Sequence, residues 1–244
     1  MIKLSEIPTI PPEGLEEKVI DTETEKLVRK LSNLQSKLFA EKKQSLLIVL
    51  QGMDGSGKDG ITKNVFKGCS PMGVSAYSFR KPTDEEFAHD FLWRVHKHAP
   101  PRGEIQIFVR SHYEDILIQR VHKWIDESRV KSRMEAINHF ERLLQFDNHT
   151  TVLKFYLHIS PTKQMEKLEE RKKDPEKYWK HNPDDIKEAV LWDEYMRCYE
   201  DVLNWSTIPW HVIPVDKRWY RDYLVAKIVV NHLEKMNPQY PPLR

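Results

Sequence analysis

The sequence predicts an α/β fold of three layers, in which a mostly parallel, five-stranded sheet is covered by helices on both faces. Five short apolar runs alternate with helical patterns, which is typical of a parallel sheet with helical crossovers. The first run is apolar from Leu46 to Leu50, as a central strand buried on both faces must be. Four of the eight glycines follow that run, within residues 52–60, and they predict a tightly curled loop between strand and helix.

Apolar runs bounded by polar or turn-forming residues place the strands in order. We expect them at Ser45–Gln51, Val74–Phe79, Glu104–Val109, Val152–Ile159 and His211–Val215.

Helical periodicity and end signals place the helices. Leucines at helical spacing predict an amphipathic helix from Gly14 to Lys43, which packs on the domain or on a second subunit. Ser160-Pro161 and Asn182-Pro183 are typical helix starts. The later helices are expected at Ile61–Lys67, Asp84–His98, Tyr113–Trp124, Ser132–Phe146, Pro161–Lys173, Asp184–Trp205 and Trp219–Met236.

Length and composition predict one principal domain. We expect an extended arm and the amphipathic helix over residues 1–44, and the main domain over 45–244 with a lid at about 160–205. The two cysteines, Cys69 and Cys198, match no zinc or redox spacing, which favours reduced thiols in a cytoplasmic protein. A net charge of +2 gives no sign of nucleic-acid binding, and we expect neither a signal peptide nor a membrane span.

The glycine-rich loop carries the strongest functional signal. Gly52, Gly57 and Lys58 have the spacing of a Walker A motif, between an apolar strand and a helix as that motif requires. In such a loop the amides around Gly55, Ser56 and Gly57 point at one anion and the lysine reaches outer phosphate oxygens. The sequence therefore predicts a P-loop kinase fold.

Two carboxylates in the loop indicate a metal. Asp59 stands where a P-loop usually has Ser or Thr, and Asp54 lies in the loop itself. Because both would repel a phosphate chain, we expect Mg²⁺ between them and the substrate, with Asp59 orienting metal-bound water.

A second group of polar residues follows the third strand. Arg110 is placed for a bidentate phosphate contact, and Glu114 or Asp115 could complete a metal site at the carboxyl edge of the sheet. The alternative for the two acids is favourable charge in a first helical turn. His112 is the one histidine we expect near phosphate.

Several segments resemble the polyphosphate kinase 2 family, in the family's order, over roughly residues 45 to 220. They are residues 52–60 (GMDGSGKDG), 81–83 (KPT), 90–96 (DFLWRVH), 110–115 (RSHYED) and 174–180 (DPEKYWK). The resemblance implies a reversible, Mg²⁺-dependent kinase that uses inorganic polyphosphate to phosphorylate nucleotides, and the 110–115 segment is most similar to the subgroup that accepts both AMP and ADP. It also implies a homo-oligomer, a dimer or tetramer, and it admits guanine nucleotides.

One residue departs from the family's pattern. Many members carry Asp or Asn directly before the Arg-Ser pair, where this chain has Val109. The family's metal role is therefore expected at Asp54 and Glu114.

Basic residues on both sides of the loop predict a channel for a long polyanion. Arg171 and Lys172 end a helix in the expected lid, while Arg80, Lys81 and Arg94 follow the second strand and could line the opposite wall. The catalytic set is expected to be Asp54, Lys58, Asp59, Arg110, Glu114 and Arg171.

Two other functions fit parts of this pattern. An ATP-dependent nucleoside monophosphate kinase of the thymidylate kinase type would share the loop, sheet and lid, and would use ATP as its sole donor. A nucleotide-binding switch without turnover would not need Arg110, Arg171 and Lys172.

Overall fold

The computed structural model describes residues 1–243 and confirms the α/β architecture. One sheet has the strand order β2-β3-β1-β4-β5, and every neighbouring pair is parallel, because each strand is followed by a helical crossover. The strands are β1 (Ser45–Gln51), β2 (Val74–Ser78), β3 (Ile105–Val109), β4 (Thr150–His158) and β5 (Trp210–Pro214).

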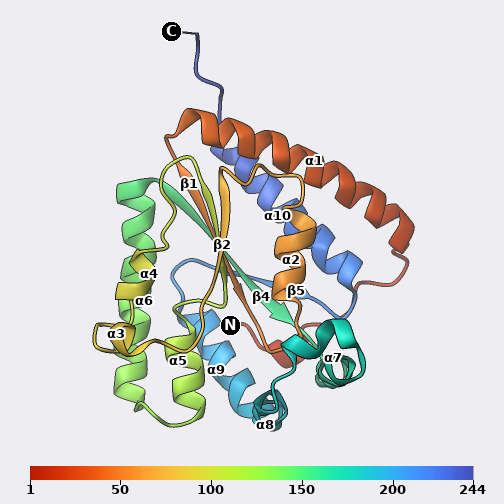
Figure 1. Ribbon diagram of the computed structural model, residues 1–244, viewed down its shortest axis with the longest axis vertical. Helices are drawn as coiled ribbons and strands as arrows, with labels where there is room; N and C mark the ends of the chain where they lie inside the picture. Colours follow the sequence, from red (N-terminus) through yellow and green to blue (C-terminus); the bar gives the residue numbers. More distant parts are fainter. Residues whose placement is uncertain (244) are drawn as a thin grey trace.

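Helices cover both faces of the sheet (Figure 1). One face carries α1 (Glu17–Glu41), α2 (Lys58–Val65) and α10 (Arg218–Met236). The other carries α5 (Glu114–Val121) and α6 (Glu127–Asn148), with α9 (Trp192–Trp205) packed beside α5. No helix among residues 1–243 is both long and apolar enough to cross a membrane.

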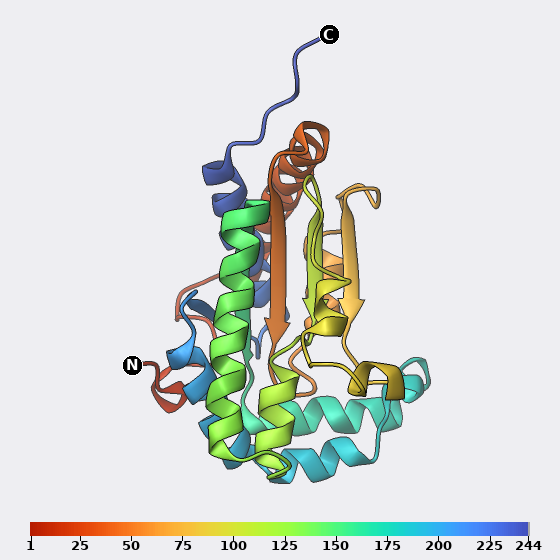
Figure 2. The same cartoon turned by 90° about the vertical axis from the view of Figure 1, so that its left-hand side faces the viewer.

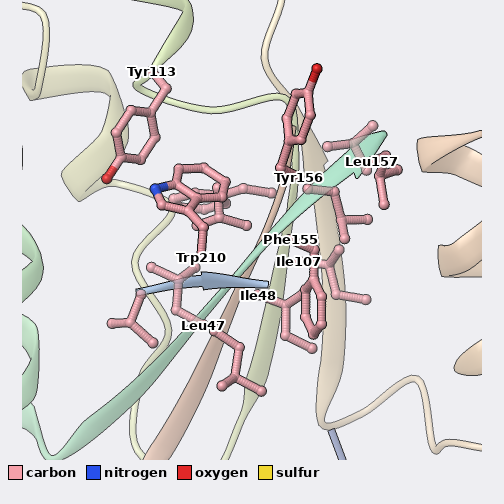
Figure 3. Close-up of a cluster of buried hydrophobic side chains, with 14 of the residues drawn as sticks. Leu47, Ile48, Ile107, Tyr113, Phe155, Tyr156, Leu157 and Trp210 are labelled. Carbon is pink, nitrogen blue, oxygen red and sulfur yellow. The ribbon is translucent and has the colours of Figure 1, made fainter. Parts of the chain in front are cut away.

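The hydrophobic core surrounds the central strands (Figure 3). All seven residues of β1 are buried, and successive side chains such as Leu47 and Ile48 contribute to opposite faces of the sheet. Leu31 and Leu38 of α1 belong to the same core, so this helix packs on the domain, chiefly along α10. A single core therefore supports the loop that follows β1.

The N-terminal segment is not a simple extended arm. It contains a 3₁₀ turn, η1 (Leu4–Glu6), and Leu4 is only 2% exposed. The amide of Leu4 donates to Glu200 Oε1 of α9 at 2.7 Å, and Thr9 Oγ1 donates to Asp216 Oδ2 at 2.9 Å. These bonds hold residues 2–9 against the domain.

Two expected helices are each broken in the structure. Residues 84–98 form two short helices, α3 (Asp84–Phe87) and α4 (Trp93–His96), because Asp90 caps a turn between them by accepting from the amide of Leu92. Residues 184–205 form α8 (Asp184–Val190) and α9, which are separated by the non-helical Leu191. In the first case a local side-chain turn interrupts the helical pattern.

A helical segment lies across the carboxyl ends of the strands (Figure 2). It consists of α7 (Pro161–Lys173), η2 (Pro175–Lys180) and α8. The Ser160 hydroxyl caps α7 by accepting from the amide of Lys163, and Pro161 stands at its first turn, as the sequence indicates. We refer to α7, η2 and α8 as the lid.

Candidate active site

The loop between β1 and α2 curls as the glycine pattern predicts. Gly52, Gly55 and Gly57 all have positive φ angles, of +148°, +88° and +89°. A Cβ atom on Gly52 would lie 2.7 Å from the carbonyl oxygen of Leu157, so this position must remain glycine. Among the described residues, the amides of Gly55, Gly57 and Lys58 find no acceptor. They are available to an anion at the N-terminus of α2.

The Lys58 side chain folds back over this loop. Its Nζ donates to the carbonyl oxygens of Gly52 at 2.6 Å and Met53 at 3.2 Å, and the residue is only 8% exposed. Burial lowers the pKa of Lys58 to about 8, although the nearby Asp54 carboxylate opposes the shift. The ammonium is thus held beside the amides that the sequence assigns to phosphate.

Arg110 and Asp54 form an ion pair across the site. Arg110 Nη2 donates to Asp54 Oδ1 at 2.5 Å, and Arg110 adopts a left-handed backbone conformation with φ +61° at the end of β3. Burial alone would raise the pKa of Asp54, but Arg110, Lys58 and Arg171 outweigh it and lower the pKa below its usual value. Asp54 is therefore ionised at neutral pH.

Glu114 lies at the start of α5 and completes the group. Its Oε1 accepts from Gln51 Nε2 at 3.2 Å, and Gln51 is the last residue of β1. The carboxylates of Asp54 and Glu114 both favour the charged forms of Lys58 and Arg110. The four side chains therefore interact electrostatically.

The lid contacts the loop directly. Lys180 Nζ of η2 lies 2.7 Å from Asp59 Oδ2, and Gln164 Nε2 of α7 donates to the carbonyl oxygen of Asp54 at 3.1 Å. Arg171 is bound within the lid by Asp185, with Nη1 2.6 Å from Oδ2. Burial would raise the pKa of Asp59, but Lys180 outweighs it and lowers the pKa.

Two residues expected at the phosphate lie elsewhere. His112 is fully buried and faces the interior, where its Nε2 is 3.3 Å from Glu141 Oε1. Arg94 is 5% exposed, donates to the carbonyl oxygen of Arg80 and pairs with Asp115 at 3.0 Å. Both side chains are held by these structural contacts, which the sequence spacing could not reveal.

The other expected cations remain at the surface. Arg80 and Lys81 follow β2, and Lys172 lies in the last turn of α7; all three are exposed and form no ion pair within residues 1–243. The role of these three side chains in binding a long polyanion stays a prediction.

Sequence reasoning missed three contacts. Gln51 and Gln164 carry neutral amides, which no motif singles out, and they hold Glu114 and the loop. Arg221 of α10 lies against Gly57 and Gly60, 161 or more positions along the chain. Gly60, which the Walker A spacing does not require, is the sequence feature that could have indicated this contact.

Comparisons with known proteins agree with this geometry. The family model for polyphosphate kinase 2 matches residues 14–241. An AMP/ADP-polyphosphate phosphotransferase of Meiothermus ruber is 46% identical over 218 residues, which cover 88% of this chain and 81% of that protein. An ADP-polyphosphate phosphotransferase of Rhodopseudomonas palustris is 35% identical over 229 residues, or 88% and 79% of the two chains.

A solved structure extends the likeness to the whole fold. The crystal structure of polyphosphate kinase 2 from Arthrobacter aurescens TC1 superposes with a TM-score of 0.95 at 36% identity, covering 99% of this chain and 88% of that one. With a phosphate loop, an acidic pair and a lid at one sheet edge, and a family model that matches nearly its full length, this chain belongs to the polyphosphate kinase 2 family.

Proposed function

We propose that this enzyme transfers the terminal phosphoryl group of inorganic polyphosphate to ADP and to AMP, and catalyses the reverse reactions. The observation that carries the proposal is the set of unpartnered amides at Gly55, Gly57 and Lys58 beside the Lys58 ammonium. Family membership favours polyphosphate as donor over ATP alone. The Meiothermus ruber relative, whose name includes both AMP and ADP, supports both acceptors.

The reaction needs positioning and charge rather than a strong base. An ionised phosphate oxygen of the acceptor attacks the terminal phosphorus of the chain, and the bond from that phosphorus to the bridging oxygen breaks. The shortened polyphosphate leaves with the electron pair as an anion. Lys58, Arg110 and Arg171 offset the charge that spreads over the transferring oxygens.

The donor set at the site fits Mg²⁺. Asp54 and Glu114 offer hard carboxylate oxygens, and Mg²⁺ commonly uses one or two carboxylates together with substrate phosphates and water. The described residues contain no group of three or more His, Cys, Asp or Glu side chains placed to hold a metal, and phosphate oxygens and water would supply the other ligands. When bound, the ion would neutralise charge between carboxylates and phosphates. Val109, buried at the end of β3 at 7% exposure, has no side-chain oxygen to contribute, and its carbonyl oxygen accepts from the amide of Phe79.

The lid excludes water from the site. Its contacts to Asp54 and Asp59 hold α7 and η2 over the loop, which favours transfer to a nucleotide over hydrolysis. Gly55 supports this approach, because a Cβ atom there would lie 3.2 Å from Lys167 Cβ of α7.

A donor and acceptor screen tests the proposal. Purified enzyme with Mg²⁺ and long-chain polyphosphate should form ATP from ADP and ADP from AMP in separate reactions. A parallel reaction with ATP and AMP but no polyphosphate tests the monophosphate kinase alternative. Transfer from ATP alone, or no transfer from either donor, would contradict the proposal.

A matched pair of variants ties the activity to the loop. Lys58→Met removes the cation at the loop, while Lys63→Met removes an exposed cation from the same helix. We expect a loss of about 10²–10³-fold in turnover for the first variant, as for other groups that stabilise transition-state charge, and none for the second.

A further inference from the structure

Arg221 of α10 is packed against the first turn of α2. The residue is 3% exposed. A Cβ atom on Gly57 would lie 2.0 Å from Arg221 Nη1, and one on Gly60 would lie 3.0 Å from Nη2. Both glycines therefore leave room for this guanidinium group.

This contact accounts for Gly60, which the Walker spacing does not require. Gly60 lies inside α2 and its φ is not positive, so backbone conformation does not demand glycine. Glycine within a helix is less stable than alanine. The cost is offset if the guanidinium group of Arg221 has to lie at this turn.

The guanidinium group has unused hydrogen-bonding capacity. Nε donates to Asp222 Oδ1 at 2.8 Å, and Nη2 lies 2.7 Å from the same oxygen but is not aligned to donate to it. Nη2 is buried without a hydrogen-bond partner, and Nη1 donates to no acceptor within residues 1–243. The second oxygen of Asp222 is taken by Asn64 Nδ2 at 2.7 Å, which fixes Arg221 and α2 together.

The positive charge at this contact favours the binding of an anion. The N-terminal end of α2 carries the positive end of the helix dipole and unpartnered amides. A guanidinium group beside it places a second positive group at the same end, while the Asp222 carboxylate that pairs with it is shared with Asn64. Nη1, which has no acceptor within residues 1–243, and Nη2, which is paired with Asp222 without a hydrogen bond to it, could both donate to the oxygens of a phosphate.

We propose that Arg221 binds a phosphate group next along the chain from the one that Lys58 reaches. In a P-loop the lysine contacts the outer phosphates while the amides of the loop cradle the inner ones, so an inner phosphate lies beside the first turn of α2. The inference rests on the proposed function and adds to it a separate subsite. The phosphate can belong to a long polyphosphate or to a nucleotide, and the two sources are distinguishable by kinetics.

The test compares KM values in Arg221→Gln and in Lys227→Gln, which removes an exposed cation from the same helix. The probes are long-chain polyphosphate, triphosphate, and ADP. If the subsite holds the donor, Arg221→Gln should raise KM for long-chain polyphosphate about tenfold, as expected for a lost charge-assisted bond, with a smaller rise for triphosphate. If it holds the nucleotide, KM for ADP should rise instead. Lys227→Gln should change neither.

A second variant, Gly60→Ala, tests the same contact with Arg221 in place, in case Arg221→Gln does not fold. Gly60→Ala places a methyl group against Arg221 Nη2 and should raise the same KM by a smaller factor. Combined with Arg221→Gln it should add nothing further, because the group it displaces is gone. Unchanged KM values in both variants, or a fall in kcat and melting temperature alone, would overturn the subsite. Those results, with Lys58→Met inactive, would leave the proposed function intact; an active Lys58→Met would instead refute the loop site itself.

Discussion

Lys180 Nζ lies 2.7 Å from Asp59 Oδ2, and this ion pair joins the lid to the first turn of α2. The two residues are 121 positions apart in the chain. Asp59 stands directly after Lys58, so the pair holds the lid next to the lysine that we propose contacts phosphate. Its geometry favours a role for Asp59 in holding the lid, beside the predicted role of orienting metal-bound water.

Breaking this pair should weaken substrate binding modestly. The side chains are 33% and 64% exposed, so solvent screens the attraction and the effect should be about two- to fivefold on KM. Steady-state kinetics should show similar rises in KM for Lys180→Gln and Asp59→Asn. The double variant should show a rise no larger than that of either single variant. Lys187→Gln, which breaks an exposed pair within α8, is the control. A much larger loss in kcat for Asp59→Asn alone would favour the metal-water role.

Activity should fall at alkaline pH because Lys58 loses its proton. Its pKa is lowered to about 8 by burial, and the charged form attracts phosphate. The value of kcat/KM for polyphosphate, which reports the free enzyme, should therefore decline as pH rises through about 8. The decline in kcat should come at higher pH, since bound phosphate stabilises the ammonium.

Lys58→Arg provides the control for this profile. Arginine remains charged over the whole range, so the variant should be less active but should lack the decline near pH 8. A wild-type profile of kcat/KM that stays flat to pH 9.5 would show that this lysine does not titrate there.

A buried ion pair behind the site should matter for stability. Lys154 Nζ of β4 lies 2.6 Å from Glu141 Oε2 of α6, both side chains are fully buried, and Tyr113 donates to the same carboxylate at 2.9 Å. Glu141→Leu leaves Lys154 uncompensated and should lower the free energy of unfolding by about 3–5 kcal/mol in urea denaturation. The double variant Glu141→Leu, Lys154→Met should recover much of that loss; an equal or larger loss would contradict this account.

Arg94 should likewise affect stability rather than phosphate binding. It neutralises Asp115, whose pKa is raised by burial despite the opposing effect of Arg94. Arg94→Met should therefore destabilise the fold by about 3–5 kcal/mol, while KM for polyphosphate in the folded variant changes less than twofold. A large rise in KM with unchanged stability would restore the channel role that the sequence indicates.

The fold could be predicted because its signals are local. The apolar run from Leu46 to Leu50 and the glycines after it predict a buried parallel strand and a curled loop, and both are confirmed. The breaks at Asp90 and Leu191 were missed, because helical periodicity alone does not show where a side chain such as Asp90 turns the chain. The family resemblance is also confirmed.

The site was predictable in part for the same reason. Asp54 and Lys58 share one loop, and Arg110 follows the neighbouring strand, so topology brings them together. By contrast, spacing alone does not show which face of the chain His112 occupies. Nor does it show that Arg221, from the last helix, returns to the loop.

The most direct test of the central claim is a crystal structure with Mg²⁺ and a polyphosphate bound. We predict phosphate oxygens within hydrogen-bonding distance of the amides of Gly55, Gly57 and Lys58, with Lys58 Nζ moved from the carbonyl of Gly52 to the phosphate. Electron density for the phosphate chain at another place, with Lys58 still bound to the loop carbonyls, would contradict the account.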